Sequence, residues 1–394
     1  MKLFVIVSSL DLTQPFSATP AWWQLFKGLY EIGVEVIVAP YQGPAIEAPW
    51  WQAAANPARR EGDTFKALRD RWRAVGGARP TPEGAAAAPD STTDRLVRRV
   101  AQTAIAPRWR AHVDRVMAAH PDIDAVLIIT VPLNHITGLA RHITERHGKP
   151  VFFYDGDVPA SLPNFRGFAS GFRIYQGADP SEYTAFLSNS LGGAEGLRAL
   201  GAREVHALYY GADPDLFSPL DVAQDLDVFF YGHGREYRGA WIDALLRDAS
   251  HALANARFAV RGTALGDLGR VEQLPYLSFS KLREYACRSK LNLVITRQAH
   301  ASVFASSSSR PFELAALGAC MVCSPYEGIE TWFEPDRELI VVSSAEEAVE
   351  RMRWLLQHDA ERRKMGRAAR ERLLKEHTFR HRAQQLVEIV RGYL

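Results

Sequence analysis

The segment Ser306–Gly318 combines groups that bind phosphate with a carboxylate that can bind sugar hydroxyls. Four serines and Arg310 stand directly before a predicted helix that opens with Pro311, and proline is favoured at a first helical position. The unpaired amides and positive dipole end of a helix start attract phosphate, and Arg310 adds a forked donor for phosphate oxygens. Glu313, one turn in, can accept two hydrogen bonds from a ribose diol. The segment therefore predicts a site for a nucleotide or a nucleotide-sugar.

The same residues also have a purely structural explanation. Glutamate is common at the third helical position, because it complements the helix dipole and can cap backbone amides there. A run of serines such as Ser306–Ser309 is often a mobile surface loop. Taken alone, the segment leaves both the nucleotide site and the structural explanation open.

A second candidate is the glycine-containing loop Gly232–Gly239, which follows a predicted strand and precedes a helix. Gly232 and Gly234 would let backbone amides approach a phosphate, and Arg235 can neutralise its charge. The spacing is not GxGxxG, so the loop lacks a dinucleotide fingerprint, and a plain tight turn explains it equally well. Two further candidates end later strands of the same half: Thr263 and Arg297.

Candidate acid–base groups occur in the first half of the chain. Asp155 and Asp157 close a predicted strand, and paired carboxylates can divide acid and base roles when their environments differ. His135 follows the strand Ala125–Thr130 and can act as a base near neutral pH. A turn in which the aspartates bond local amides, and a helix-cap pair of Asn134 with His135, are the alternatives. The spacing of histidines and carboxylates indicates no metal site.

Composition and charge exclude several classes of protein. The chain has 394 residues and a formal net charge of +2, so no global field draws it to nucleic acid. Its N-terminal apolar run ends at Asp11, which is short for a membrane span and reads as a first strand. We therefore expect a cytoplasmic protein without nucleic-acid partners.

Apolar strands alternate with helices along the chain, a pattern typical of parallel sheets covered on both faces. The first series of predicted strands comprises 3–8, 34–40, 125–130, 151–154, 185–188 and 205–210, and the second comprises 226–231, 258–261, 291–296, 319–324 and 339–342. The turn-rich segment Tyr210–Pro219 separates the two series. This organisation predicts two doubly wound, Rossmann-like α/β domains that face each other across a cleft, with ligands beyond the carboxyl ends of the strands.

The segment Asp94–Arg115 carries six arginines and is interrupted by Pro107. Such a segment can lie on anionic lipid, which would make the protein a peripheral membrane binder. A solvated helix face is the alternative that we favour.

The second half of the chain resembles the group-1 glycosyltransferases of GT-B fold, and within them most closely the CgeB-like branch. The resemblance is carried by Arg310–Ala319, by shorter matches further along and by two upstream turns. These shorter matches are 326–330, 333–335, 376–383, 155–159 and 210–214. In this family a glutamate at the position of Glu313 binds the donor ribose, and another glutamate often stands eight positions earlier, where this chain has Ala305.

The resemblance implies that the chain transfers a sugar from a nucleotide-diphosphate sugar to an acceptor that the sequence does not identify. The donor would be UDP-, GDP- or dTDP-linked, the reaction retaining and hexosyltransferase-like, and no metal or other cofactor is implied. It also implies an acceptor domain over 1–219, a donor domain over 220–377 and a last helix, 378–394, that crosses back to the first domain.

These inferences assign roles to individual residues. We expect Asp155, Asp157 and His135 in catalysis and the following residues in donor binding: Gly232, Gly234, Arg235, Thr263, Arg297, Ser308, Ser309, Arg310 and Glu313. Two other functions remain open. One is a catalytically silent GT-B scaffold or surface protein, which Ala305 supports, and the other is a nucleotide-sugar-modifying enzyme such as an epimerase.

Overall fold

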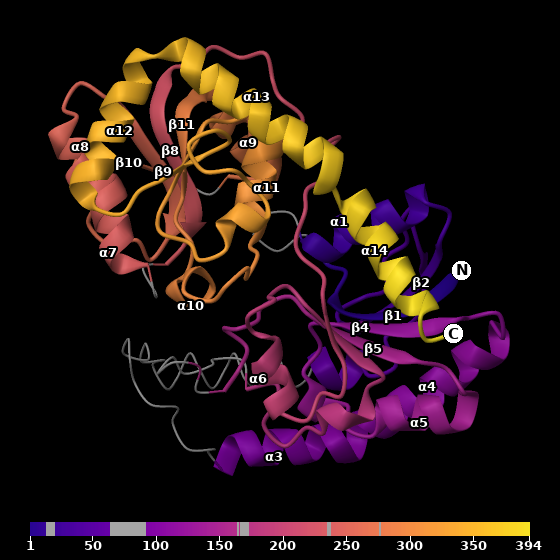
Figure 1. Cartoon of the computed structure of the whole chain (residues 1–394). Helices are drawn as coiled ribbons and strands as arrows, with labels where there is room; N and C mark the ends of the chain where they lie inside the picture. The colour runs from indigo at the N-terminus through magenta and orange to yellow at the C-terminus, as the bar shows by residue number, and fades with distance from the viewer. Residues whose placement is uncertain (13–19, 64–91, 164, 166–172, 235–237, 276) are drawn as a thin grey trace. The chain divides into compact units, whose positions relative to one another are not determined.

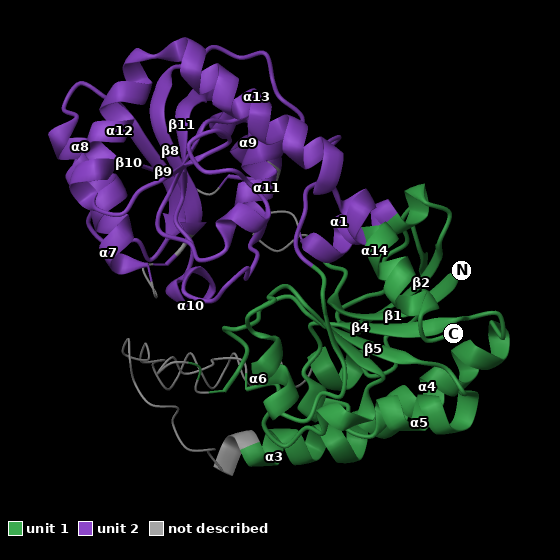
Figure 2. Ribbon diagram, in the orientation of Figure 1, with its two compact units in different colours: residues 1–13, 29–208, 383–394 green, residues 14–28, 209–382 purple. Residues whose placement is uncertain are grey.

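The computed structural model describes the chain except for residues 13–19, 64–91, 164, 166–172, 235–237 and 276 (Figure 1). The described residues form two compact units (Figure 2). Unit 1 comprises residues 1–13, 29–208 and 383–394, and unit 2 comprises residues 14–28 and 209–382.

Within its described residues, unit 1 is built on a seven-stranded, wholly parallel sheet in the order β3-β2-β1-β4-β5-β6-β7. The central strands are buried over almost their whole length, as expected for strands covered on both faces. In register, Leu3 of β1 lies between Val36 and Ala125. The strands are β1 (Lys2–Ser9), β2 (Glu35–Gln42), β3 (Gln52–Ala53), β4 (Ala125–Ile129), β5 (Val151–Asp155), β6 (Ala185–Ser188) and β7 (Val205–Ala207).

Helices pack on this sheet and fill the core of unit 1. Trp109 from one of them is fully buried against the sheet residues Phe4 and Val126 in the same apolar cluster. The end of the chain returns to this unit, where Tyr393 packs edge-on against Phe152 and its hydroxyl lies 2.7 Å from His206 Nε2. The helices are α3 (Thr92–Val100), α4 (Ala106–Ala119), α5 (Leu139–His147) and α6 (Ala194–Ala199).

Unit 2 has the same kind of sheet, six parallel strands in its described part, in the order β10-β9-β8-β11-β12-β13. Phe229, Phe312 and Trp332 belong to the larger of its apolar clusters. The strands are β8 (Leu226–His233), β9 (Phe258–Thr263), β10 (Glu272–Leu274), β11 (Ser289–Val294), β12 (Met321–Cys323) and β13 (Ile340–Val341), and the helices are α7 (Gly239–Ile242), α8 (Ala249–Ala252), α9 (Phe279–Arg288), α10 (Gln298–Ala301), α11 (Ser309–Ala316), α12 (Ala345–Gln357) and α13 (Asp359–Glu376).

The borders of the units do not coincide with the predicted domain borders at 219/220 and 377/378. The whole turn-rich segment Tyr210–Pro219 belongs to unit 2, where Ala212 exchanges backbone hydrogen bonds with His377 and Phe379. The helix α1 (Ala21–Glu31) begins in unit 2, where Lys27 pairs with Asp213 at 3.0 Å. The last helix, α14 (Phe379–Arg391), likewise begins in unit 2, and its residues from 383 onward belong to unit 1.

In the part of the chain that the structure describes, no helix is long and apolar enough to cross a membrane.

Candidate functional site

The strand order of unit 2 reverses between β8 and β11. From β8 the chain builds outward through β9 and β10, and it then returns to add β11 on the other side of β8. In open parallel sheets, ligands bind outside the carboxyl ends of the strands at such a switch point. Here those ends are Gly232 and His233 on β8, and Ile295 and Thr296 directly after β11.

Arg310 occupies this switch point. Its Nη1 donates to the carbonyl oxygen of Ile295 at 3.3 Å, and its guanidinium carbon lies 4.9 Å from the ring centroids of both Phe230 and Tyr231. A Cβ atom on Gly232 would lie 3.0 Å from Arg310 Nη2 and 2.8 Å from Phe230 Cζ. Glycine at position 232 therefore makes the room that the guanidinium fills.

Glu313 lies fully buried beside this arginine. Its Oε2 accepts a hydrogen bond of 2.9 Å from the hydroxyl of Tyr231. Burial raises the pKa of the Glu313 carboxyl, and the Tyr231 hydrogen bond and the positive charge of Arg310 act in the opposite direction. Burial also lowers the pKa of Arg310. Holding these two ionisable groups at the end of the sheet therefore costs free energy of desolvation.

Several buried polar atoms at this place have no well-formed hydrogen bond to any described residue. They are Thr296 Oγ1, Ser308 Oγ, Arg310 Nε and Glu313 Oε1. Such an atom costs about 1–3 kcal/mol when nothing satisfies it, and native proteins contain few of them. Both donors and an acceptor are represented, so the cluster suits a ligand that carries oxygen acceptors and hydroxyl groups.

The start of α11 differs in detail from the prediction. The helix begins at Ser309, with Ser308 as its extended N-cap residue, so Pro311 is the third helical residue and not the first. Proline is tolerated there for the same reason, because the first four amides of a helix have no intrahelical partner. The Ser308 side chain does not cap the helix, which leaves the amides of the first turn without a side-chain partner from that residue.

The serine run is not a mobile loop. Ser306 and Ser307 are fully buried. The Ser307 hydroxyl accepts a hydrogen bond of 2.9 Å from the backbone of Tyr210, and the Tyr326 hydroxyl donates to the Ser306 carbonyl at 2.5 Å. These contacts hold the approach to α11 in place, so the alternative of a mobile loop is wrong for Ser306 and Ser307.

The glycine loop lies at the same edge of the sheet. Gly234 has a left-handed backbone (φ 63°), and its N–H donates to the carbonyl of Thr263 at 2.7 Å. A Cβ on Gly262 would come within 2.1 Å of the Gly232 carbonyl oxygen, so the ends of β8 and β9 meet without side chains between them. The predicted phosphate ligand Arg235 lies outside the described residues.

Arg297 and a histidine that sequence reasoning missed lie close by. Arg297 is the N-cap residue of α10, next to the end of β11. His300, in α10, is only 3% exposed, and burial together with the charges of Arg297 and Arg238 places its pKa well below 6.5. His300 is therefore neutral at pH 7. Tyr231 and Thr296 were missed as well, because a tyrosine and a threonine in apolar strands give no signal of their own.

Ala305 has a left-handed backbone (φ 48°) and is buried. Its N–H donates to the Glu327 carbonyl at 3.1 Å, and a Cβ on Gly328 would lie 2.4 Å from that nitrogen. Tight backbone packing therefore surrounds the position where the resembling family often has a glutamate.

Asp155, in unit 1, is engaged in a closed hydrogen-bond network. It is 1% exposed and accepts from Ser161 Oγ at 2.6 Å, from Tyr175 Oη at 2.5 Å and from the Asp157 N–H at 3.0 Å. Burial raises the pKa of its carboxyl, and the Ser161 and Tyr175 hydrogen bonds oppose that rise. This geometry is the turn that we gave as the alternative, and the catalytic role of Asp155 and Asp157 stays a prediction.

His135 lies at the end of a short 3-10 turn in unit 1, and its Nδ1 is 2.9 Å from the Tyr41 hydroxyl. Burial and the charge of Arg98 lower its pKa from 6.5 to about 4. The imidazole is therefore neutral at pH 7 and a weaker base than an exposed histidine. Its predicted catalytic role also stays a prediction.

The part of the chain that contains this site is similar to a known protein family. Residues 235–388 match the family described as "Glycosyl transferase-like". The matched part contains α11, Arg310 and Glu313. The match covers most of unit 2 and ends within α14, so this part of the chain is similar to glycosyltransferases. No curated protein matches the sequence.

Several solved structures are similar over the whole chain. Sucrose-phosphate synthase from Thermosynechococcus elongatus is 13% identical, with a TM-score of 0.67 and coverage of 100% of this chain and 99% of that one. HepE from Anabaena, in complex with UDP, is 14% identical, with a TM-score of 0.59 and full coverage of both chains. The trehalose 6-phosphate synthase of Burkholderia multivorans is 12% identical, with a TM-score of 0.61 and coverage of 99% and 98%. The fold is GT-B. The predicted fold class is confirmed at this level.

Proposed function

We propose that this protein is a glycosyltransferase that uses a nucleoside-diphosphate sugar held by unit 2. The observation that carries the proposal is the cluster of buried polar atoms around Arg310 and Glu313 at the switch point, some of which have no well-formed hydrogen bond within the described chain. The HepE structure of similar fold contains UDP, which supports a nucleoside diphosphate as the ligand.

Each group in the cluster has a chemical role in this proposal. Arg310, Arg297 and the amides at the start of α11 would bind the diphosphate, with Ser308 and Ser309 as hydroxyl donors. Gly232 and Gly234 would let the backbone approach it. Glu313 Oε1 would accept hydrogen bonds from the ribose hydroxyls, while its Oε2 is already held by Tyr231.

The reaction follows from this binding mode. The oxygen of an acceptor hydroxyl forms a bond to the anomeric carbon, and the bond from that carbon to the diphosphate oxygen breaks. The diphosphate leaves with the electron pair and takes up the proton that the acceptor hydroxyl loses. The departing oxygen gains negative charge, which arginine side chains and a helix start can stabilise. We therefore propose transfer without a metal cofactor and, by analogy with the resembling family, with retention of configuration.

The finer assignments are proposals of the same kind. We propose a relative of the CgeB-like branch, a hexosyl donor linked to UDP, GDP or dTDP, and an enzyme of the cytoplasm. For the arginine-rich residues 94–115, contact with anionic lipid stays the less favoured alternative to a solvated helix face.

One observation favours a second function. Ala305 stands where the family often has a glutamate, so that position has no carboxylate. A catalytically silent GT-B protein that binds a nucleotide without transferring a sugar would show this departure.

The proposal is tested by presenting UDP, GDP and dTDP, and then their sugars, to the full-length protein. We expect one nucleoside diphosphate to raise the melting temperature. At 100 times its dissociation constant, the nucleotide should increase the free energy of unfolding by about 2.7 kcal/mol. Arg310→Ala should abolish that shift, whereas Arg337→Ala, an exposed arginine of the same unit that pairs with Glu334 at 2.8 Å, should keep it. No shift at millimolar nucleotide would overturn the assignment. A shift without donor-sugar hydrolysis or transfer would favour the silent protein.

A further inference from the structure

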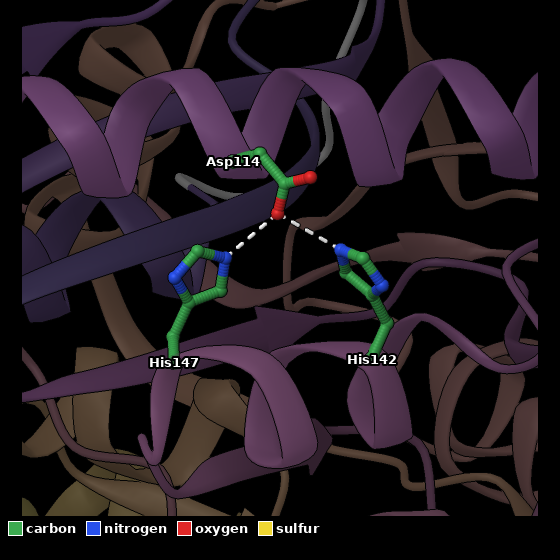
Figure 3. Close-up of side chains that lie close together, drawn as sticks. All are labelled: Asp114, His142 and His147. Carbon is green, nitrogen blue, oxygen red and sulfur yellow. Dashed lines mark hydrogen bonds and ion pairs between the residues drawn. The ribbon is translucent and has the colours of Figure 1, made fainter.

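Two helices of unit 1 bring together three side chains of the types that bind metal ions. Asp114 comes from α4, and His142 and His147 come from α5 (Figure 3). Asp114 Oδ1 lies 2.9 Å from His142 Nε2 and 2.7 Å from His147 Nε2. In the described part of the chain, these residues form the group of histidine, cysteine and acidic side chains that could hold a metal, with all ligand atoms within 4.8 Å of one another.

We propose that Asp114, His142 and His147 form a binding site for a divalent transition metal ion such as Zn²⁺. Two imidazole nitrogens and one carboxylate oxygen are the ligand types that zinc accepts from proteins, and a three-ligand set leaves a fourth position for water. Imidazole also suits copper, nickel and iron, so the shared chemistry is that of a first-row transition metal rather than of Mg²⁺ or Ca²⁺.

The distances fit this proposal. Zinc–nitrogen and zinc–oxygen bonds of about 2.0–2.2 Å place tetrahedral ligand atoms roughly 3.3 Å apart. The imidazole nitrogens already point at the same carboxylate oxygen from either side, as Figure 3 shows, at 2.7 and 2.9 Å. A shift of the Asp114 oxygen by a fraction of an ångström away from the two nitrogens would open these distances to that spacing, and the contact between α4 and α5 keeps the three side chains together.

The position of the cluster also suits a cation. His147 is the last residue of α5, and Gly148 follows it as a left-handed C-cap, so the negative end of the helix dipole lies at the site. The side chains are 19% to 28% exposed, which lets an ion reach them from solvent. A neutral imidazole binds through Nε2 once its ring proton sits on Nδ1, so this step needs a change of tautomer and no oxidant or base.

One neighbour opposes the metal. Arg146 Nε lies 3.4 Å from Asp114 Oδ1, and its positive charge would repel the ion. Its side chain is 63% exposed, so the guanidinium can turn into solvent when the ion binds. This arginine provides a variant that should act in the direction opposite to loss of a ligand.

The test measures binding of zinc to the full-length protein after removal of metal with a chelator, by calorimetry and by competition with a chromogenic indicator. We expect saturable binding of one ion per chain and a zinc-dependent rise in melting temperature. Cobalt, used as a second probe, should give the visible absorption of a low-coordinate site. Loss of an outer hydrogen-bond partner alone weakens metal sites about 10–100-fold, so His142→Gln, His147→Gln and Asp114→Asn should each weaken binding at least tenfold.

Matched variants separate the metal site from simple loss of folding. His142→Gln keeps an N–H donor for Asp114, so the variant should keep the metal-free melting temperature while losing the zinc response. His120→Gln changes a histidine outside the cluster and should bind as the wild type does, and Arg146→Ala should bind zinc at least as tightly. Absence of saturable zinc binding by the wild type would overturn the proposal, as would equal zinc affinity of the wild type and folded His142→Gln.

Discussion

The Tyr231 hydroxyl and Glu313 Oε2 are 2.9 Å apart although 82 residues separate them in the chain. This hydrogen bond fixes a fully buried carboxylate at the carboxyl edge of the second sheet and turns its other oxygen, Oε1, to a place without a well-formed hydrogen bond among the described residues. A carboxylate that serves only as a helix cap would accept hydrogen bonds from backbone amides at the helix start. This geometry argues against a purely capping role for Glu313, and its ribose-binding role stays a prediction.

The first prediction concerns Glu313 itself. Hydrogen bonds to a charged group contribute about 1.5–3 kcal/mol, so Glu313→Ala should weaken nucleotide binding tenfold or more. Glu313→Gln keeps the length of the side chain and an acceptor for Tyr231 but removes the charge, so it should fold well and bind less tightly. Calorimetry on the folded variants gives both affinities. A nucleotide without ribose hydroxyls should bind the wild type poorly and lose little more in Glu313→Ala; equal affinities for wild type and variant would exclude the ribose role.

Tyr231→Phe is the second prediction. The change removes one hydroxyl from a buried pair and leaves Glu313 Oε2 without its donor, which should destabilise the fold by about 1–3 kcal/mol. Because the carboxylate is then no longer held in one orientation, nucleotide affinity should also fall. Urea unfolding and calorimetry measure the two effects. Unchanged stability would mean that the hydrogen bond does not form in solution.

Gly232→Ala tests the space around Arg310. The added Cβ would meet Phe230 Cζ at 2.8 Å and Arg310 Nη2 at 3.0 Å, so the Phe230 ring and the guanidinium that lies over it must shift. Overpacking of this kind typically costs about 1–3 kcal/mol, and diphosphate affinity should drop further than stability alone explains. Gly239→Ala is the control, since a Cβ there meets nothing within 4 Å. Equal nucleotide affinity of the two alanine variants would contradict the phosphate role of Arg310.

The fourth prediction is that sugar transfer survives exhaustive chelation. In our proposal, arginine side chains and the start of α11 stabilise the negative charge of the leaving diphosphate. Turnover should therefore not need a metal ion. If the histidine–aspartate site of unit 1 holds zinc, chelation should lower the melting temperature but not turnover at a temperature well below it. Turnover lost with EDTA and restored by manganese or magnesium would refute metal independence.

His135 predicts a dependence of stability on pH. Its pKa in the folded chain is about 4, below the ordinary 6.5, chiefly because of burial. At pH values between about 4 and 6.5, the unfolded chain binds more protons at this residue than the folded chain does. The stability that neutral His135 contributes is therefore present above pH 6.5 and is lost as the pH falls toward 4. The loss should be about 2–3 kcal/mol from this residue. His135→Gln should lose less stability over that range in urea titrations than the wild type or the His120→Gln control; parallel curves for all three proteins would disprove it.

The alternation of apolar strands and helices determined the architecture from the sequence alone. Continuous apolar runs such as those at β1 and β8 must be covered on both faces, which predicts parallel sheets and a doubly wound fold. The segment around Arg310 and Glu313 was found from residue types alone, because a helix start beside an arginine and a glutamate is a local feature. The short edge strands β3 and β10 were missed, since two or three partly exposed residues carry no periodic signal.

Tertiary structure decided which of these residues meet. Pairing of β8 with β11 places Gly232 and Arg310 together, and packing decides that Glu313 is buried against Tyr231 instead of capping a helix. The cluster of Asp114 with His142 and His147 depends in the same way on the contact between α4 and α5, across separations of 28 and 33 residues. Sequence patterns report the local period of a strand or helix. Contacts between distant segments depend on strand order and helix packing, which no local period records.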